Sequence, residues 1–325
     1  MPKVEFDKRE RVSQAADTAN QIIQMIERAL LGQRRAVELA TCAFLAGGHI
    51  LIEDVPGVGK TTLARALARA SGGEFRRIQF TSDILPADIT GVSVWDSTTG
   101  EFKFKPGPIF GNVVLADEIN RSTPKTQSAL LEAMSEGSVS VDGSPKKLPM
   151  PFTVIATQNA QEHHGAYPLP ESQLDRFLIR ISMGYPNAAS EKKIVSRPSL
   201  GDPVEAVQPV VSPDRAADLA LAVDQIHMDD AVLDYLMELV MRTRQTDLLE
   251  LGVGPRGGMA LHRAARAHAL LKGRDFCLAD DVKDLALPIL AHRVIPAETS
   301  WNGTGSRQNA INGLQEILAR VEIPV

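Results

Sequence analysis

The segment Asp54-Val55-Pro56-Gly57-Val58-Gly59-Lys60-Thr61-Thr62 combines glycines, a lysine and hydroxyl groups at the spacing of a phosphate-binding loop. Glycines allow successive backbone N–H groups to turn toward one anion, and the N-terminus of a following helix adds positive potential. Lys60 is placed to reach the outer phosphates of a nucleotide, and Thr61 to bind Mg²⁺ through its hydroxyl. The usual pattern opens with glycine where this chain has Asp54. The alternative is an ordinary glycine turn before a helix.

Paired carboxylates supply a second element of chemistry. Asp117 and Glu118 end the apolar segment 111–116, and carboxylates at the carboxyl edge of a parallel sheet face the crevice where ligands bind. There Asp117 can hold Mg²⁺ through water, and Glu118 can polarise an attacking water. Asn159 follows the apolar segment 152–157 and is a candidate to orient that water against the γ-phosphate. The alternatives are a solvated acidic turn and an ordinary turn asparagine.

These residues require a sheet to bring them together. Apolar segments predict strands at 49–53, 75–80, 113–117, 152–157 and 177–182, with helices such as 15–30, 62–70 and 125–135 between or beside them. Alternating strands and helices predict an α/β domain over residues 25–184, with a parallel sheet buried under helices on both faces. Helical patterns after residue 184 predict an all-α lid domain over 185–325. Residues 1–24 are expected to form an N-terminal tail, polar over residues 1–20, and the sequence leaves open whether this tail is ordered or mobile.

Two hairpins are expected to interrupt this alternation. Residues 90–107 alternate apolar and polar side chains around Gly100, and residues 138–148 turn on Asp142-Gly143. Each hairpin is either a surface decoration or a loop that carries contacts to another molecule.

Composition narrows the class of protein. The chain has 325 residues, a net charge of −5 and a pI of about 5.9, which gives no global electrostatic reason to bind DNA or RNA. The N-terminal residues lack the apolar core of a secretory signal, and no apolar stretch reaches the length of a membrane span, so a cytoplasmic protein is expected. Cys42 and Cys277 are expected to be small buried side chains, and His163-His164 a solvated loop rather than a zinc site.

Several motifs in order and spacing resemble the MoxR family of AAA+ ATPases over residues 25–295. They are Gly32-Gln33, the phosphate loop, Gln79-Phe80-Thr81, Leu85-Pro86-Ala87-Asp88-Ile89, Ala116-Asp117-Glu118-Ile119-Asn120-Arg121, Ala156-Thr157-Gln158-Asn159 and Tyr167-Pro168-Leu169-Pro170-Glu171-Ser172-Gln173-Leu174-Asp175-Arg176-Phe177. An aspartate at the position of Asp54 is familiar in that family. The two hairpins fall where this clade carries insertions.

The resemblance implies a role for each matching residue. Gly32 and Gln33 resemble the loop against the adenine; Lys60 and Thr61 resemble Walker A, Asp117 and Glu118 Walker B, and Asn159 sensor 1. Arg176 resembles the arginine finger that a neighbouring subunit inserts, with Arg180 as the next candidate, and Arg256 after Pro255 resembles sensor 2. The implied cofactors are ATP and Mg²⁺. The implied assembly is a homo-oligomer, a hexameric ring, and the implied partners are proteins with von Willebrand factor A domains or other clients.

Two other functions remain open from the sequence. One is a DNA-directed AAA+ ATPase, although the Gly-Ala-Phe-Thr-Gly-Ala loop of enhancer-binding activators is absent from residues 89–107. The other is a nucleotide-dependent scaffold with little turnover, which the intact Asp117-Glu118 pair argues against. For Arg176, the alternative to a finger is a pair with Asp175 or Glu171 on a helix face.

Overall fold

The computed structural model describes residues 2–159, 167–196, 201–297 and 306–323. His163-His164, expected to form a solvated loop, lie outside these ranges. The chain forms two compact units. We call Gln21–Leu169 with Ile181–Ala217 the sheet unit, and Met1–Asn20, Pro170–Arg180 and Asp218–Val325 the helical unit.

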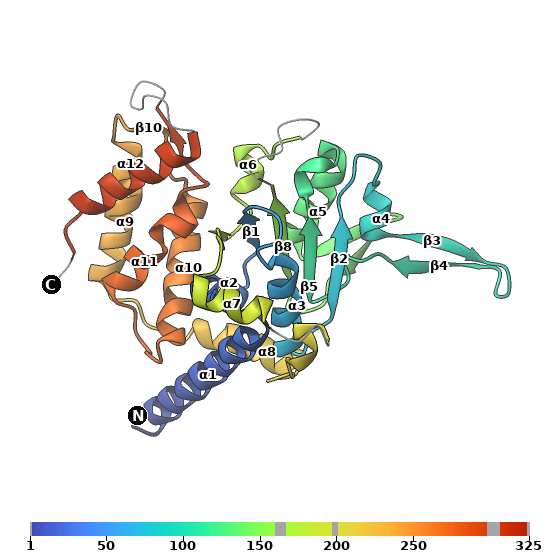
Figure 1. The fold of residues 1–325 in the computed structure, drawn as a ribbon, viewed down its shortest axis with the longest axis horizontal. Coiled ribbons are helices and arrows are strands. Elements are labelled where there is room, and N and C mark those ends of the chain that lie inside the picture. The colour runs from blue at the N-terminus through green and yellow to red at the C-terminus, as the bar shows by residue number, and fades with distance from the viewer. Residues whose placement is uncertain (1, 160–166, 197–200, 298–305, 324–325) are drawn as a thin grey trace. The chain divides into compact units, whose positions relative to one another are not determined.

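A five-stranded sheet has the order β2-β5-β8-β1-β9 (Figure 1); its first four strands form the core of the sheet unit, and β9 is divided between the two units. Its strands are β1 (Ile50–Glu53), β2 (Phe75–Gln79), β5 (Val113–Asp117), β8 (Thr153–Gln158) and β9 (Ile179–Ile181). The pairs β1–β8, β5–β8 and β2–β5 are parallel, as expected. The three central strands are buried almost throughout, whereas the edge strand β2 buries only Ile78 and exposes polar side chains. A parallel sheet covered on both faces requires such apolar central strands.

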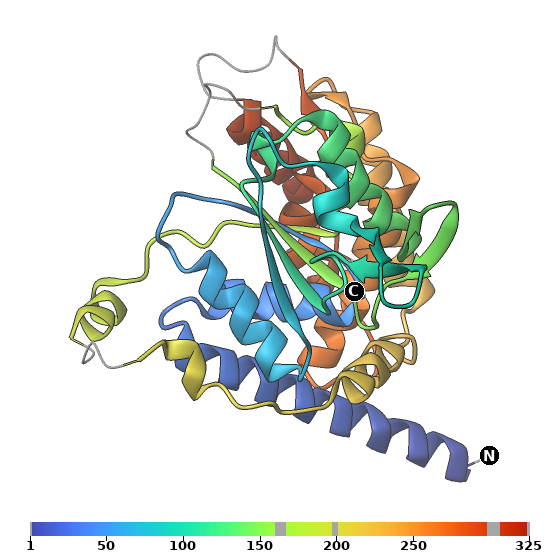
Figure 2. The same ribbon diagram turned by 90° about the vertical axis from the view of Figure 1, so that its right-hand side faces the viewer.

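Helices cover both faces of the sheet; α3 and α5 lie on opposite sides of it (Figure 2). The helices of this unit are α2 (Arg34–Leu45), α3 (Lys60–Ala70), α4 (Pro86–Thr90), α5 (Pro124–Glu136) and α7 (Ala188–Val195), with single turns η1 (Ile119–Arg121) and η2 (Pro203–Ala206). The helix α3 consists of strong helix formers and turns Leu63, Ala64 and Leu67 inward, fully buried.

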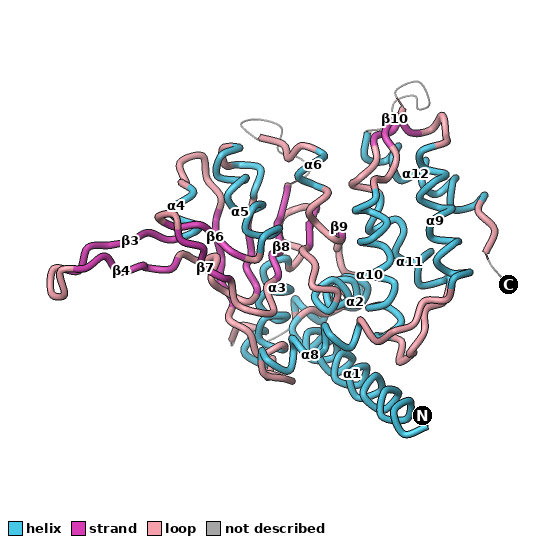
Figure 3. Tube along the Cα trace, turned by 180° about the vertical axis from the view of Figure 1, so that it is seen from behind, coloured by secondary structure: helices cyan, strands magenta, loops and turns pink. Residues whose placement is uncertain are grey.

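Both expected hairpins are present and pair antiparallel. The first joins β3 (Gly91–Asp96) to β4 (Glu101–Pro106), and the second joins β6 (Ser138–Val141) to β7 (Ser144–Lys147). Figure 3 shows β3 and β4 extending away from the five-stranded sheet. The hairpins contact one another, because the Ser93 hydroxyl donates to the Asp142 carboxylate and the Lys146 ammonium lies 5.7 Å from the centre of the Phe104 ring.

The helical unit consists mainly of four helices: α9 (Asp230–Arg244), α10 (Pro255–Leu271), α11 (Ala279–Leu290) and α12 (Ser306–Arg320). It also contains the short helix α6 (Glu171–Leu174) and the strand pair β10 (Leu249–Leu251) and β11 (Ile295–Pro296). Cys277 of this unit and Cys42 of the sheet unit are both buried, as expected. Among the described residues, no helix is both long and apolar enough to cross a bilayer.

The limits of the units differ from the expected division at residue 184. Residues 181–217 belong to the sheet unit, because Asp202 pairs with Arg65 of α3 and the Val210 amide donates to the Ala70 carbonyl. Residues 170–180 belong to the helical unit, where Asp175 is bound by Arg293. Contacts between residues far apart in the sequence set these limits, and local composition does not reveal them.

The N-terminal segment also differs from expectation. The helix α1 runs from Pro2 to Ala29; it confirms the expected helix at 15–30 and extends it back through the segment expected to be a tail. Both α1 and the helix α8 (Pro213–Val223) belong partly to each unit. Apolar side chains recur in α1 at helical spacing and are buried: Val12, Ala15, Ala16, Ala19, Ile22, Ile23 and Ile26. This interval of three and four residues makes one apolar face among charged neighbours, which the overall polarity of the segment conceals.

Candidate functional site

The phosphate loop lies between β1 and α3, as its sequence predicts. Gly57 and Gly59 adopt φ angles of 84° and 99°, a region that side chains other than glycine rarely enter. A Cβ on Gly59 would also lie 2.7 Å from Cδ1 of Leu30, a side-chain end that would have to shift, so the positive φ is the main reason for glycine here. Lys60 opens α3, and its ammonium donates to the Asp54 carbonyl at 2.7 Å. The loop thus joins a glycine turn, a helix N-terminus and a lysine in one place.

Asp54, the departure from the usual loop pattern, has a structural explanation. Its buried carboxylate accepts hydrogen bonds from the amides of Met183 and Gly184 at 2.5 and 2.7 Å, and from the Val55 amide at 2.8 Å. Burial raises the pKa of Asp54, but the hydrogen bonds from Gly184, Val55 and Met183 outweigh it, and the net shift is downward. The side chain therefore shapes the loop by binding it to residues 183–184.

Gly184 also connects the loop to the Gly32-Gln33 segment. The Gln33 side-chain amide is buried and donates to the Gly184 carbonyl at 2.9 Å. Gly32 has a φ of 75°, and a Cβ there would lie 2.6 Å from Cβ of Ser190. Residues 32–33, 54–62 and 183–184 are therefore brought together in the sheet unit through Gly184.

The paired carboxylates lie at the end of β5, where Thr157 of the neighbouring strand β8 holds them. The Thr157 hydroxyl donates to the Asp117 carboxylate at 2.6 Å and accepts from the Glu118 amide at 2.9 Å. Glu118 has φ 57° and ψ 48°, a left-handed conformation that is strained for a residue other than glycine. Strain of this kind is common at functional sites, and here the bond to Thr157 maintains it.

Two side chains of the edge strand β2 contact the same carboxylates. Nη2 of Arg77 donates to Asp117 Oδ2 and to Gln79 Oε1, each at 2.6 Å. The Gln79 amide nitrogen in turn donates to Glu118 Oε2 at 2.9 Å, and Arg121 forms an ion pair with the same oxygen at 2.9 Å. The register pairs Gln79 with Asp117, which explains this proximity.

The donors at this edge of the sheet are suited to Mg²⁺. Asp117 offers a carboxylate and Thr61 a hydroxyl, and magnesium prefers such oxygen ligands completed by water and phosphate.

Burial lowers the pKa of Lys60, while the charges of Asp54, Asp117 and Glu118 raise it; the net shift is downward. Lys60 therefore lies within the field of all three carboxylates. Within the described residues, no cluster of three or more His, Cys, Asp or Glu could hold a metal by itself.

Asn159 directly follows β8, which lies between β1 and β5 in the sheet. The phosphate loop, the carboxylates and Asn159 therefore follow three adjacent strands. Because β1, β5 and β8 are parallel, their carboxyl ends share one edge of the sheet. The fold brings these three motifs together, as their sequence positions predicted.

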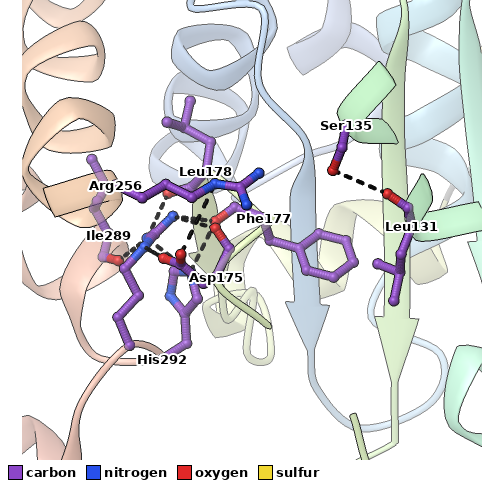
Figure 4. Close-up of polar contacts among 9 residues, drawn as sticks. Leu131, Ser135, Asp175, Phe177, Leu178, Arg256, Ile289 and His292 are labelled. Carbon is purple, nitrogen blue, oxygen red and sulfur yellow. Dashed lines mark hydrogen bonds and ion pairs between the residues drawn. The ribbon is translucent and has the colours of Figure 1, made fainter. Parts of the chain in front are cut away.

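The three arginines with expected roles in hydrolysis, Arg176, Arg180 and Arg256, belong to the helical unit. In this unit Asp175 forms ion pairs with two arginines. Arg256 lies in the first turn of α10 and forms an ion pair with Asp175 at 3.9 Å. Figure 4 shows Arg256, Asp175, Phe177 and His292 converging. Arg293 completes the group with bonds to the Asp175 carboxylate at 2.8 Å and to the Phe177 carbonyl at 2.6 Å. Arg176 and Arg180 also fall in this unit, next to these residues in the sequence.

Sequence reasoning assigned no role to several of these residues. Thr157 resembles any β-branched residue of a buried strand, and the sequence indicates Asp175 only as an alternative partner of Arg176, not of Arg256 or Arg293. One pattern in the sequence could have identified Arg77 and Gln79. They alternate on β2 with apolar Ile78, as in a strand with one polar face. Which carboxylate that face meets depends on strand order, which the sequence does not show.

Comparisons with known proteins agree with this geometry. Residues 49–179 match the family model described as "ATPase family associated with various cellular activities (AAA)", and residues 241–311 match the model of the AAA lid domain. The chain is 48% identical over 304 residues to the uncharacterized protein YeaC of Bacillus subtilis, covering 93% of this chain and 94% of that one.

Two named relatives and one solved structure extend the match. Chaperone MoxR1 of Mycobacterium tuberculosis is 39% identical, covering 94% of this chain and 83% of its own. Protein MoxR of Methylorubrum extorquens is 33% identical, covering 86% of this chain and 88% of its own. The crystal structure of a candidate ATPase from Cytophaga hutchinsonii matches all of both chains with a TM-score of 0.88 at 33% identity. With the sheet, the loop and the helical lid in place, the chain belongs to the MoxR family of AAA+ ATPases.

Proposed function

We propose that this protein binds ATP with Mg²⁺ and hydrolyses it at the carboxyl edge of its sheet. The observation that supports this most directly is the placement of Lys60, the Asp117-Glu118 pair and Asn159 after three adjacent strands. Such an arrangement holds a triphosphate, a metal and an attacking water close to one another, and phosphoryl transfer depends on positioning and electrostatic stabilisation of this kind.

Each residue has a proposed role in this reaction. Residues 54–62 bind the phosphates through backbone amides and Lys60, and Gly32 with Gln33 lies against the adenine. Thr61 and Asp117 hold the metal, which neutralises charge on the phosphates when bound. Glu118 polarises the attacking water and Asn159 orients it.

We further propose that the active form is a hexameric ring. Arg176, or failing it Arg180, serves as a finger for the nucleotide of a neighbouring subunit, and Arg256 serves as sensor 2. Fingers of this kind contribute about 10³ to 10⁵ in rate, so hydrolysis is expected to be slow in the monomer. The pairing of Arg256 with Asp175, the residue before Arg176, supports a link between the two arginines.

The proposed output is remodelling or maturation of partner proteins in the cytoplasm, including insertion of cofactors or metals. One relative carries the name Chaperone MoxR1, which supports this class of work. Proteins with von Willebrand factor A domains are the proposed partners. The projecting hairpin β3–β4 exposes Trp95 and Phe102 and offers a surface for them.

The substitution Glu118→Gln tests the reaction. We expect it to preserve ATP affinity and to lower the hydrolysis rate by about 10²- to 10⁴-fold, because the amide cannot accept a proton from water. ATP affinity is measured by calorimetry and turnover by phosphate release. Glu132→Gln, on the exposed face of α5, is the matched control and should behave as wild type.

Hydrolysis at the wild-type rate in the Glu118→Gln protein would assign water activation to another residue. If the wild-type protein binds ATP without turnover, the scaffold function is the correct one. Stimulation of turnover by DNA would instead favour the DNA-directed function.

A further inference from the structure

Four side chains form a continuous chain of hydrogen bonds at the end of β5: Asp117, Arg77, Gln79 and Glu118. Its direction is determined by chemistry, because a guanidinium only donates. Gln79 must therefore accept from Arg77 through its oxygen and donate to Glu118 through its nitrogen. A cation of the protein thus binds the carboxylate proposed to hold the metal, and one glutamine connects it to the carboxylate proposed to activate water.

We infer that Arg77 is a positioning residue that holds Asp117 in the absence of metal and releases it when the metal binds. This inference rests on the proposed function, since it assumes that Asp117 holds the metal through water. The occupant is a divalent cation arriving with ATP, and Arg77 competes with it for the same carboxylate.

The charges require this competition. Asp117 Oδ2 accepts from Arg77 at 2.6 Å, and its other oxygen accepts from Thr157 at 2.6 Å, so both carboxylate oxygens already have a partner. A guanidinium and a divalent cation repel each other at such distances. A water that links Asp117 to the metal therefore competes with Arg77 for Asp117 Oδ2, and a looser bond to Arg77 relieves the repulsion.

The surroundings of Arg77 make the release inexpensive. Its side chain is 49% exposed, whereas that of Asp117 is 16% exposed. The half-exposed guanidinium is already hydrated on its outer side, so water can replace the contact that Arg77 loses on release. Gln79 Oε1 holds the same guanidinium nitrogen and keeps Arg77 beside the site after release. Arg77 can therefore return once the metal leaves.

The neighbouring arginine provides a matched control. Arg76 precedes Arg77 on β2, points to the opposite face of the strand and pairs with Glu74. Its side chain is 53% exposed, close to the value for Arg77. Among the described residues its ion pair is with Glu74 and not with Asp117 or Glu118. Removing Arg76 therefore removes the same charge from the same strand without touching Asp117.

The test is the ratio of ATP affinities measured with Mg²⁺ and with EDTA, by calorimetry on the full chain. In Arg77→Met we expect ATP to bind about two- to five-fold more tightly than in the wild type with Mg²⁺, and equally well with EDTA. The gain is small because Arg77, which competes with the metal, is held only as strongly as an exposed ion pair. Arg77→Lys keeps the charge and should return the ratio to within two-fold of wild type. Arg76→Met should leave both affinities unchanged.

Each other outcome contradicts a distinct part of this account. An unchanged ratio in Arg77→Met, with normal ATP binding by the wild-type protein, would reject the role of Arg77 alone. A loss of affinity with and without Mg²⁺ would make Arg77 a nucleotide contact instead. Absence of ATP binding by the wild-type protein would reject the proposed function itself.

Discussion

Arg293 and Arg77 each bind an aspartate, the first in the helical unit and the second at the edge of the sheet. The Arg293 side chain is 3% exposed and bonds the Asp175 carboxylate together with the carbonyls of Phe177, Leu178 and Ile289. Arg77 is 49% exposed and bonds one carboxylate oxygen and one amide oxygen. The same pair of functional groups can therefore act as a permanent anchor or as an exchangeable contact, depending on burial and on the number of partners.

Burial also affects the protonation equilibrium of the Arg293 guanidinium. It lowers the pKa of Arg293 to about 10, against the opposing effect of Asp175. A guanidinium with this pKa remains charged at neutral pH, so the fold must supply partners for its five buried N–H groups. The Asp175 carboxylate and the carbonyls of Asp175, Phe177, Leu178 and Ile289 meet that demand, as expected for a buried cation.

Removing the anchor should produce the largest effect. We expect Arg293→Met to lower the free energy of unfolding by about 3 to 5 kcal/mol, because Asp175 and three carbonyls lose their donor inside the helical unit. Urea denaturation followed by circular dichroism measures the loss, and hydrogen exchange should locate it in α10 and α11. A loss below about 1 kcal/mol would mean that this pair is no stronger than one at the surface.

The second-largest effect on stability is expected at low pH, where the buried Asp281 becomes protonated. Burial raises its pKa, but bonds from His268, Arg274 and the Leu278 amide outweigh this and lower the pKa from 3.8 to about 2. A depressed pKa stabilises the fold above the unfolded value, so about 2 kcal/mol should be lost as pH falls from about 5 to 2. Urea titrations over this range compare wild type with Asp281→Asn, whose stability should depend less on pH. Equal slopes would contradict the assignment.

The smallest effect on stability is expected at Arg77. Arg77→Met should change the free energy of unfolding by less than about 1 kcal/mol, because the half-exposed guanidinium is already hydrated in the folded protein and Thr157 still donates to Asp117. The same urea experiment measures it beside Arg293→Met. A loss comparable to that of Arg293→Met would make Arg77 a structural anchor and remove the contrast between the two pairs.

Much of the site could be predicted because its motifs are local. A glycine-rich loop between an apolar segment and a helix, and two acids after another apolar segment, identify themselves within eight residues each. The strand order then brings them together without further information, since parallel strands end on one edge. The helix α9 shows the limit of local patterns: Leu233 and Met237 are apolar at helical spacing but are 37% and 43% exposed, while Val232 and Tyr235 are buried. Both faces carry apolar residues, and only packing selects the inner one.

The sequence alone determined that this chain has a parallel sheet, a phosphate loop, a carboxylate pair and two hairpins, because each depends on residues close together in the chain. The tertiary structure decided why Asp54 is needed, which arginine meets Asp117, and which segments join each unit. Those features depend on contacts across more than a hundred residues, such as Asp54 with Gly184 and Asp175 with Arg293, or on the pairing of β2 with β5. No local pattern encodes such contacts, because their free energy arises only once distant strands and helices have packed.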